Sequence, residues 1–352
     1  MKTLNRTFTP DNEILKMIAE IDEFKGKWTF LKTVSPERLT GLKKVATIES
    51  IASSTRIEGS ELSDEEVYKL LSNIDKKSFK NRDEQEVAGY AEVMDIIFLS
   101  FNELNITENY IKQLHSILLK YSSKDKRHRG EYKKINNSVE AFSGEGKSIG
   151  VIFKTASPFD TPYRMEDLVN WLKKALTEKE FHPLIIITMF VVEFLEIHPF
   201  QDGNGRLSRI LTTLLLLKLN YIYVPYSSIE SIIEENKDSY YSTLRRTQKT
   251  FQEDKIDYYP WVRFFLGVLI KQKNNLEMKI HDISKVRFKD LPSLSVNILE
   301  VIKNKQKIKI SDIVNYTQGN RNTVKLHIKN LLEKGYIKSF GQGKGTWYEN
   351  NE

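Results

Sequence analysis

Twelve consecutive residues contain most of the side chains that could carry out chemistry, in the order His198-Pro-Phe-Gln-Asp-Gly-Asn-Gly-Arg-Leu-Ser-Arg209. Pro199 disfavours helical geometry at the residue before it, so His198 is expected at a helix end, facing outward, where its imidazole can act as a base. Gly203 and Gly205 flank an asparagine, and glycines readily take the left-handed backbone that turns successive N–H groups toward an anion. The pattern predicts a base beside an anion-binding loop.

The same segment adds a carboxylate and two guanidinium groups. Asp202 supplies oxygen ligands of the kind that Mg²⁺ prefers. A helix that begins after the glycines would direct its N-terminus at an anion, and Arg206 and Arg209 would project from its first turn on the same side. Each feature is common by itself, since a lone histidine, a Gly-Asn-Gly turn or an arginine pair is usually structural or solvated. Together within one segment they indicate a phosphate-handling site.

Helices are expected to position this segment. Apolar residues at helical spacing, with capping residues, glycines or prolines at the boundaries, predict a mainly α chain. The stretch 122–162 is irregular apart from Ser148–Lys154, whose alternation is typical of a strand or hairpin arm. The predicted helices cover residues 11–25, 36–58, 84–99, 111–119, 164–176, 183–196, 206–219, 230–248 and 259–283.

The C-terminal end has the pattern of a separate unit. Helices are expected at 294–302, 311–316 and 320–333, and strands at 307–310, 336–340 and 346–348, an order typical of a winged helix-turn-helix. Residues 291–352 hold nine Lys and one Arg against five acidic residues, so +5 of the net charge of +7 lies here. Arg321, Lys325 and Lys329 on the third helix favour contact with DNA through residues 290–352. The unit could instead serve protein contacts or dimerisation.

The composition is that of a globular protein. The 352 residues are 40% hydrophobic and 29% charged and include no cysteine, which excludes disulfides and cysteine metal sites. No apolar signal segment follows Met1, and the apolar run from Pro183 to Phe194 is too short to span a bilayer. We therefore expect a cytoplasmic protein with no membrane partner, in three parts: an N-terminal helical region (1–100), a core (101–284) and the C-terminal part (285–352).

The segment from His198 to Arg209 resembles the signature of the Fic family, His-Pro-Phe-x-Asp/Glu-Gly-Asn-Gly-Arg-x-x-Arg, at every specified position. A second stretch, Ser54-Thr-Arg-Ile-Glu58-Gly59, resembles the inhibitory pattern Ser/Thr-x-x-x-Glu-Gly/Asn of that family. The resemblance extends over roughly residues 10–270.

Smaller features add to the resemblance or depart from it. Gly130-Glu-Tyr is similar to the stretch that precedes the family's flap, and Tyr240-Tyr241 to a pair that follows the core. Lys133 and Lys134 stand where relatives often carry an arginine, and Gln248 lies where some carry an asparagine. These departures concern details of the nucleotide pocket rather than the chemistry.

The resemblance implies a Fic-type helical bundle core with a β-hairpin flap. It implies transfer of AMP from ATP to a Ser, Thr or Tyr hydroxyl of a target protein, including self-modification, with release of pyrophosphate. His198 would take the hydroxyl proton, Asp202 would hold Mg²⁺, and Phe200 would point into the core and brace the loop. The residues that would bind the nucleotide are Gly203, Asn204, Gly205, Arg206, Arg209 and Tyr241.

Two further expectations concern access to this site. The expected flap, 146–155, could pair with an extended target peptide by strand addition, or it could be an ordinary surface hairpin. Ser54 and Glu58 are four residues apart and share a helix face, so the Glu58 carboxylate could pair with Arg209 and occupy the guanidinium that the γ-phosphate needs. Glu58 would otherwise be solvent-exposed near a helix end.

Other functions are compatible with these motifs. A DNA-binding regulator with a vestigial core would act through the C-terminal part alone, although the intact segment 198–209 favours catalysis. A Fic enzyme could also use another donor, for example one that delivers UMP, or could remove AMP. A homodimer is compatible with the resemblance.

Overall fold

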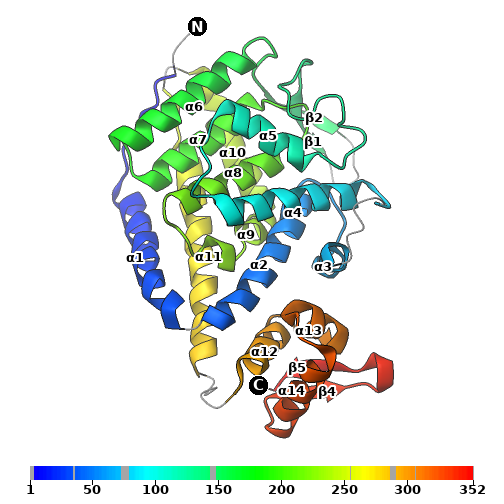
Figure 1. Cartoon of the computed structure of the whole chain (residues 1–352). Helices are drawn as coiled ribbons and strands as arrows, with labels where there is room; N and C mark the ends of the chain where they lie inside the picture. The colour runs from blue at the N-terminus through cyan, green and yellow to red at the C-terminus, as the bar shows by residue number, and fades with distance from the viewer. Residues whose placement is uncertain are drawn as a thin grey trace.

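The computed structural model describes residues 4–34, 36–72, 79–142, 148–253, 255–285, 291–305 and 307–351, and helices dominate it (Figure 1). The larger part of the chain forms a helical body. Its helices are α1 (Asn12–Val34), α2 (Pro36–Ile57), α3 (Asp64–Ser72), α4 (Arg82–Ser100), α5 (Glu108–Leu118), α6 (Thr161–Glu178), α7 (Pro183–Ile197), α8 (Asn204–Lys218), α9 (Ile229–Glu235), α10 (Lys237–Lys249) and α11 (Tyr259–Lys285).

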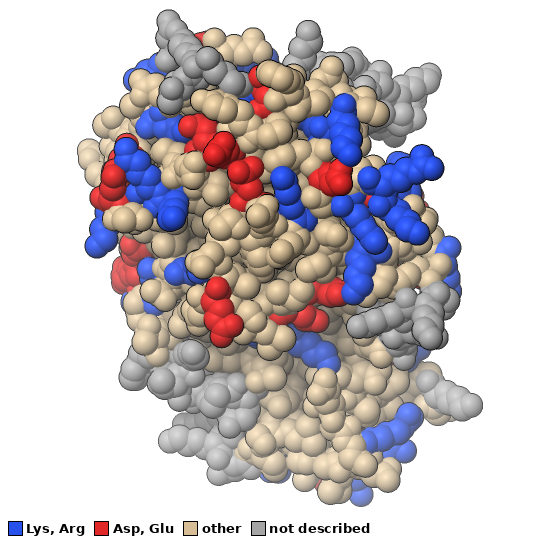
Figure 2. All heavy atoms as spheres, turned by 45° about the horizontal axis from the view of Figure 1, so that its top comes forward, with Lys and Arg blue, Asp and Glu red and all other residues tan. Residues whose placement is uncertain are grey.

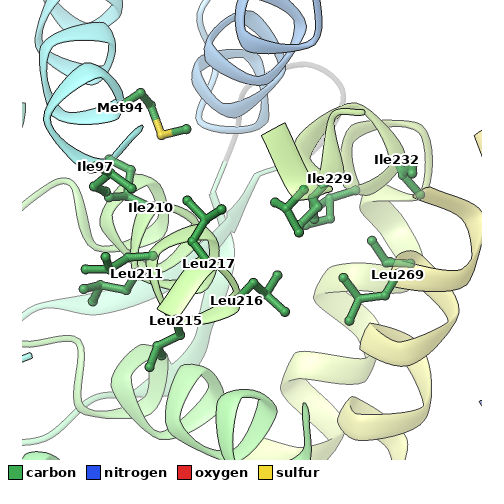
Figure 3. Close-up of a cluster of buried hydrophobic side chains, with 14 of the residues drawn as sticks. Met94, Ile97, Ile210, Leu211, Leu215, Leu216, Leu217, Ile229, Ile232 and Leu269 are labelled. Atoms are coloured by element: carbon green, nitrogen blue, oxygen red, sulfur yellow. The ribbon is translucent and has the colours of Figure 1, made fainter. Parts of the chain in front are cut away.

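Two consecutive helices, α7 and α8, form the centre of this body. α7 is apolar on all sides and is buried from Leu184 to Ile197, as expected of a helix enclosed by others. Figure 3 shows the leucines of α8 in a cluster with residues from three other helices, all of them buried. The labelled members are Leu211, Leu215, Leu216 and Leu217 with Ile210 of α8, Met94 and Ile97 of α4, Ile229 and Ile232 of α9, and Leu269 of α11. The loop between α7 and α8 is therefore held at both ends by buried helices.

Capping residues set several boundaries as the sequence predicts. Asp11 accepts a hydrogen bond from the backbone N–H of Ile14 at 2.9 Å at the start of α1. Ser63 and Glu66 form a capping box before α3, with the Ser63 N–H donating to the Glu66 carboxylate at 2.9 Å. The helix predicted over 230–248 is instead two helices, because the Asn236 side chain donates back to the Ile232 carbonyl at 2.7 Å and its backbone leaves helical geometry.

A two-stranded antiparallel hairpin stands between α5 and α6. It consists of β1 (Ser138–Phe142) and β2 (Ser148–Lys154), with Ser138 opposite Lys154. The arm predicted at 148–154 is confirmed as a strand. Residues 146 and 147 of the expected flap lie outside the described residues.

The C-terminal unit, residues 291–351, follows the order of elements expected from the sequence. It contains α12 (Ser293–Lys305), β3 (Ile308–Lys309), α13 (Ile310–Thr317), α14 (Arg321–Glu333), β4 (Ile337–Phe340) and β5 (Trp347–Asn350), with strand order β3-β5-β4. α13 begins at Ile310, one residue earlier than predicted. The winged-helix assignment and the boundaries of the three parts remain predictions.

The C-terminal unit packs against α2 and α3 of the helical body, as Figure 1 shows. The rings of Tyr68 and Tyr316 stack with centroids 4.0 Å apart, and the Lys44 ammonium donates to the Asn315 carbonyl at 2.7 Å at the end of α13. Across the part of the chain that is described, none of the helices has the length and apolar character needed to cross a bilayer.

Candidate active site

His198 lies directly after α7, at the helix end that Pro199 predicts. Its backbone is left-handed, with φ 52° and ψ 60°, and its N–H donates to the Phe194 carbonyl at 2.9 Å. The side chain is half-buried rather than fully outward. Burial, together with the nearby charge of Lys133, lowers the pKa of His198 to about 4. The imidazole is therefore neutral at pH 7, which is the form that can accept a proton.

The loop after His198 ends in the N-terminus of α8. Gly203 takes the left-handed conformation, with φ 78°, and α8 begins at Asn204. The Asn204 side chain is buried and tied to the loop: its Oδ1 accepts from the Phe200 N–H at 2.9 Å, and its Nδ2 donates to the Phe200 carbonyl at 2.7 Å. That side chain shapes the loop instead of reaching toward a ligand. The backbone N–H of Asn204 is therefore the group of this residue that could donate to an anion.

Arg209 is buried and bound to α2. Its Nε donates to the Ser54 hydroxyl at 2.8 Å, and its Nη2 donates to the Ser54 carbonyl at 2.9 Å and to Glu58 Oε1 at 2.8 Å. Its Nη1 is buried and, within the described residues, has no hydrogen-bond partner. The contact expected between Glu58 and Arg209 is therefore present.

The Glu58 carboxylate also lies over the first turn of α8. A Cβ built on Gly205 would come within 2.1 Å of Glu58 Oε1, so the carboxylate occupies the space that this glycine leaves open. Burial alone would raise the pKa of Glu58, but the guanidinium groups of Arg209 and Arg206 hold it below its ordinary value. An anion from the chain itself thus fills part of the predicted anion site.

Arg206 is buried among acidic partners from α4 and from the loop that precedes α8. Its Nη1 lies 2.8 Å from Glu86 of α4, and its Nη2 lies 3.2 Å from Asp202 Oδ1. Arg82, also of α4, donates to Asp202 Oδ2 at 2.6 Å. Burial raises the pKa of Asp202, but Arg206 and Arg82 outweigh this effect and lower it. Arg82 and Glu86 were not singled out in the sequence, because each lies more than a hundred residues from its partner in the segment.

Asp202 is the residue that could hold Mg²⁺. Within the described residues, no group of three or more His, Cys, Asp or Glu side chains surrounds a common point. Mg²⁺ at nucleotide sites is often held by one or two carboxylates together with phosphate oxygens and waters, so a single partly exposed carboxylate fits that mode of binding. The residues present are compatible with a metal that arrives with a nucleotide.

His115 of α5 supports the loop, although the sequence did not indicate it. Its Nδ1 accepts from the Gly130 N–H at 2.8 Å, which requires the tautomer with the proton on Nε2, and Nε2 donates to the Asp202 carbonyl at 3.0 Å. The ring stacks on buried Phe200 with centroids 3.8 Å apart. Burial lowers the pKa of His115 to about 4. A lone histidine on the apolar face of a helix carried no signal of this role.

Tyr240 and Tyr241 of α10 lie near Arg209 and Glu58. Tyr240 is buried, and its ring meets that of Tyr241 edge-on at 5.1 Å. Burial raises the pKa of Tyr241, with the Glu58 charge adding to the effect, so this phenol lies within the field of the site. The structure brings Ser54, Glu58 and residues 198–209 together around the ends of α2, α7 and α8, with Tyr241 on the neighbouring α10.

Comparisons with known proteins identify the domain that contains residues 198–209. Residues 105–216 match the model of the Fic/DOC family. The chain carries a Fic domain. Residues 198–209 lie within the matched region, and the mainly α architecture predicted from the sequence is confirmed as the Fic fold.

Relatives of the Fic domain cover different parts of the chain. One is named "Probable protein adenylyltransferase" from Aquifex aeolicus, 32% identical over 31% of this chain and 33% of its own length. Another is the protein adenylyltransferase Fic of Aedes aegypti, 28% identical over 63% of this chain and 40% of its own length. The chain thus spans about two fifths or less of the length of these two relatives.

Solved structures share the fold. A Fic family protein from Desulfovibrio desulfuricans is 22% identical, covers 99% of this chain and 98% of its own, and superposes with a TM-score of 0.64. A Fic domain containing signaling protein from Bacteroides thetaiotaomicron is 24% identical, covers 75% and 98%, and has a TM-score of 0.59. The first likeness extends across the C-terminal unit as well as the Fic domain.

Proposed function

We propose that this protein transfers AMP from ATP to a hydroxyl group of a protein. In this reaction the hydroxyl oxygen attacks the α-phosphorus, the bond to the bridging oxygen breaks, and pyrophosphate leaves. His198 takes the hydroxyl proton on its free imidazole nitrogen. The N–H groups at the start of α8 and the guanidinium groups of Arg206 and Arg209 bind the phosphates, and Tyr241 lines the pocket. Asp202 would hold Mg²⁺, which neutralises charge that develops on the phosphates.

The observation that carries the proposal is that a carboxylate already occupies the anion site beside a neutral histidine. Glu58 pairs with Arg209 at 2.8 Å and lies over Gly205. A site that binds a carboxylate with a buried guanidinium and a helix N-terminus has the chemistry to bind a phosphate in its place. His198 stands at the opposite end of the same short loop, where a base for an acceptor hydroxyl is required.

The same contact supports autoinhibition by Glu58. While Arg209 is paired with Glu58 and Ser54, a γ-phosphate lacks that anchor, and ATP binds with its α-phosphate poorly aligned for in-line attack. Loss of alignment can lower a rate by orders of magnitude with little effect on affinity. Removing the carboxylate is therefore expected to raise turnover more than it changes ATP affinity.

The test compares transfer by four proteins: wild type, Glu58→Gly, Glu58→Ala and Glu58→Gly/His198→Ala. Each is incubated with Mg²⁺ and ATP labelled at the α-phosphate, and AMP adducts on the chain itself are counted by intact mass. We expect both Glu58 variants to label at least tenfold faster than wild type, and the His198 variant to lose labelling while it still binds ATP by calorimetry. Glu58→Ala separates loss of the charge from fraying of the helix end by glycine, which costs about 1 kcal/mol.

The same assay distinguishes other reactions. Labelling from UTP in preference to ATP would change the donor, and release of AMP from a modified chain by wild type would indicate the reverse reaction. Substantial labelling by the His198 variant would contradict the role of His198 as base. Equal rates for wild type and both Glu58 variants would contradict the proposed autoinhibition by Glu58.

We propose in addition that the C-terminal unit binds duplex DNA. Arg321, Lys325 and Lys329 are all exposed on α14, whereas α12 and α13 are the helices of this unit that pack against α2 (Figure 1). On the helical body, by contrast, basic and acidic side chains are interspersed over the face in Figure 2, and residues 1–290 carry only +2 of the net charge of +7. A cytoplasmic location and a homodimer remain expectations from the sequence.

A further inference from the structure

A buried lysine joins the base of the hairpin to the catalytic loop. The Lys133 side chain is 3% exposed, and its ammonium donates to three oxygens: Asn137 Oδ1 at 2.8 Å, Thr155 Oγ1 at 2.8 Å and the Ile197 carbonyl at 3.0 Å. An ammonium has three N–H donors, so all of them are used. Burial lowers the pKa of Lys133 to about 8, which shows that the charge is held there at a cost.

Two of the three acceptors belong to the residues at which the hairpin leaves the helical body, here called its roots. Asn137 immediately precedes β1, and Thr155 immediately follows β2. Their side chains also meet each other, with Thr155 Oγ1 2.7 Å from Asn137 Oδ1. The single ammonium of Lys133 therefore fixes both strands where they leave the helical body.

The remaining bonds of this group reach the backbone on both sides of His198. The Lys133 N–H donates to the Pro199 carbonyl at 2.8 Å, and Asn137 Nδ2 donates to the Phe200 carbonyl at 2.8 Å. Together with the bond from Lys133 to Ile197, three carbonyls within residues 197–200 are bound to the root of the hairpin. The catalytic base and the hairpin are thus parts of one hydrogen-bonded assembly.

We propose that Lys133 is a positioning residue that sets the hairpin relative to His198 and so places the acceptor hydroxyl, without taking part in nucleotide binding. This inference rests on the proposed function and on the expectation from the sequence that an acceptor peptide pairs with the hairpin. The bonds of Lys133 go to the hairpin roots and to the end of α7, whereas the anion site is formed by α2 and the start of α8. Its loss should therefore affect acceptor transfer and leave ATP affinity intact.

The neighbouring lysine provides a matched control. Lys134 carries the same charge one residue later, but its side chain is 77% exposed and pairs with Glu131 at 2.6 Å. Lys133→Met keeps an unbranched side chain only one atom shorter and removes its donors, and Lys134→Met makes the same chemical change outside the assembly. Thr155→Val, which removes one hydroxyl with little change of shape, tests the same assembly if Lys133→Met does not fold.

The experiment uses the full chain carrying Glu58→Gly and measures three quantities: labelling of the chain with AMP, the Kd for ATP by calorimetry, and amide hydrogen exchange of the two strands, residues 138–142 and 148–154. We expect Lys133→Met to lower labelling by about tenfold or more, to leave the Kd for ATP within about twofold, and to speed exchange in the hairpin. Lys134→Met should match the parent in all three.

Three results would overturn the inference: unchanged exchange in the hairpin, faster exchange with unchanged labelling, or a weakened Kd for ATP. The first would show that Lys133 does not hold the hairpin, the second that hairpin position does not matter, and the third that Lys133 acts on the nucleotide. If the Glu58→Gly parent labels nothing with any donor, the proposed function fails, and hydrogen exchange alone still decides whether Lys133 holds the hairpin.

Discussion

Gly205 is the residue at which the candidate anion site meets the Glu58 carboxylate, so it allows phosphate binding and the proposed inhibition to be tested separately. In a Glu58→Gly chain, the nearest contact of a new Cβ at Gly205 would be Arg209 Nη1 at 3.3 Å. Gly205→Ala in that chain should not weaken the fold, because alanine favours a helix by up to about 1 kcal/mol over glycine. It should nevertheless weaken ATP binding at least tenfold, since a methyl group would stand where the phosphate approaches. Calorimetry with ATP and a denaturant melt together test this, and unchanged ATP affinity would show that phosphate binds elsewhere.

His115 leads to a prediction about stability and pH. Its folded pKa of about 4 is below the ordinary value of 6.5, so between these pH values the unfolded chain binds more protons than the folded one. Stability is therefore intact above pH 6.5 and falls as the pH decreases toward 4, by about 3 kcal/mol for this one group. His115→Asn cannot titrate, so it should be less stable at pH 7 but lose less stability on acidification. Urea melts at several pH values measure both slopes, and equal slopes for the two proteins would contradict the assignment.

At this scale the sequence indicated the residues of the candidate site but not the residues that support them. The residues of 198–209 and Ser54 with Glu58 were predicted from local patterns, and the pairing of Glu58 with Arg209 is present. Arg82, Glu86 and His115 escaped notice because their roles depend on contacts between distant segments, which one sequence does not reveal. Asn204 was expected to bind the nucleotide, but both polar atoms of its side chain are used by the loop.

Among the elements, the crossing of α4 and α5 depends on a glycine. A Cβ at Gly89 of α4 would lie 2.0 Å from the Leu118 carbonyl of α5, so Gly89→Ala forces the two helices apart. We expect a loss of roughly 1–3 kcal/mol in unfolding free energy from such overpacking. Gly26 of α1 is a matched control, because no atom lies within 4 Å of its Cβ position and alanine there should stabilise the helix by about 0.5–1 kcal/mol. A Gly89→Ala chain as stable as wild type would show that the helices can move apart freely.

The helices themselves were the most predictable feature of the chain. α7 and α8 follow from long apolar runs with proline or glycine at the boundaries, which are local signals. The break at Asn236 was missed, since the apolar spacing continues across it and the interruption comes from one side-chain hydrogen bond. The attachment of the hairpin to residues 197–200 could not be predicted, because it depends on contacts between segments that are distant in the sequence.

For the whole molecule, the C-terminal unit leads to a prediction about salt. If the three basic residues exposed on α14 contact phosphates, DNA affinity should fall roughly 40-fold between ~50 and ~200 mM salt. Lys329→Ala should reduce the slope of log affinity against log salt by about one, whereas Lys134→Ala, on the helical body, should leave it unchanged. Fluorescence anisotropy with a duplex oligonucleotide measures both. No binding at the lower salt concentration would favour protein contacts as the role of this unit.

The packing of the C-terminal unit on α2 and α3 has a thermodynamic consequence. α2 carries Lys44, which contacts the end of α13, and ends at the turn that holds Glu58 against Arg209. The binding of two ligands that act on one shared helix is thermodynamically linked. If a ligand of the C-terminal unit changes the affinity for ATP by some factor, ATP must change the affinity for that ligand by the same factor. Measuring either binding reaction with and without the other ligand therefore gives the same coupling free energy, and a value of zero would mean that α2 transmits nothing between the two ends of the molecule.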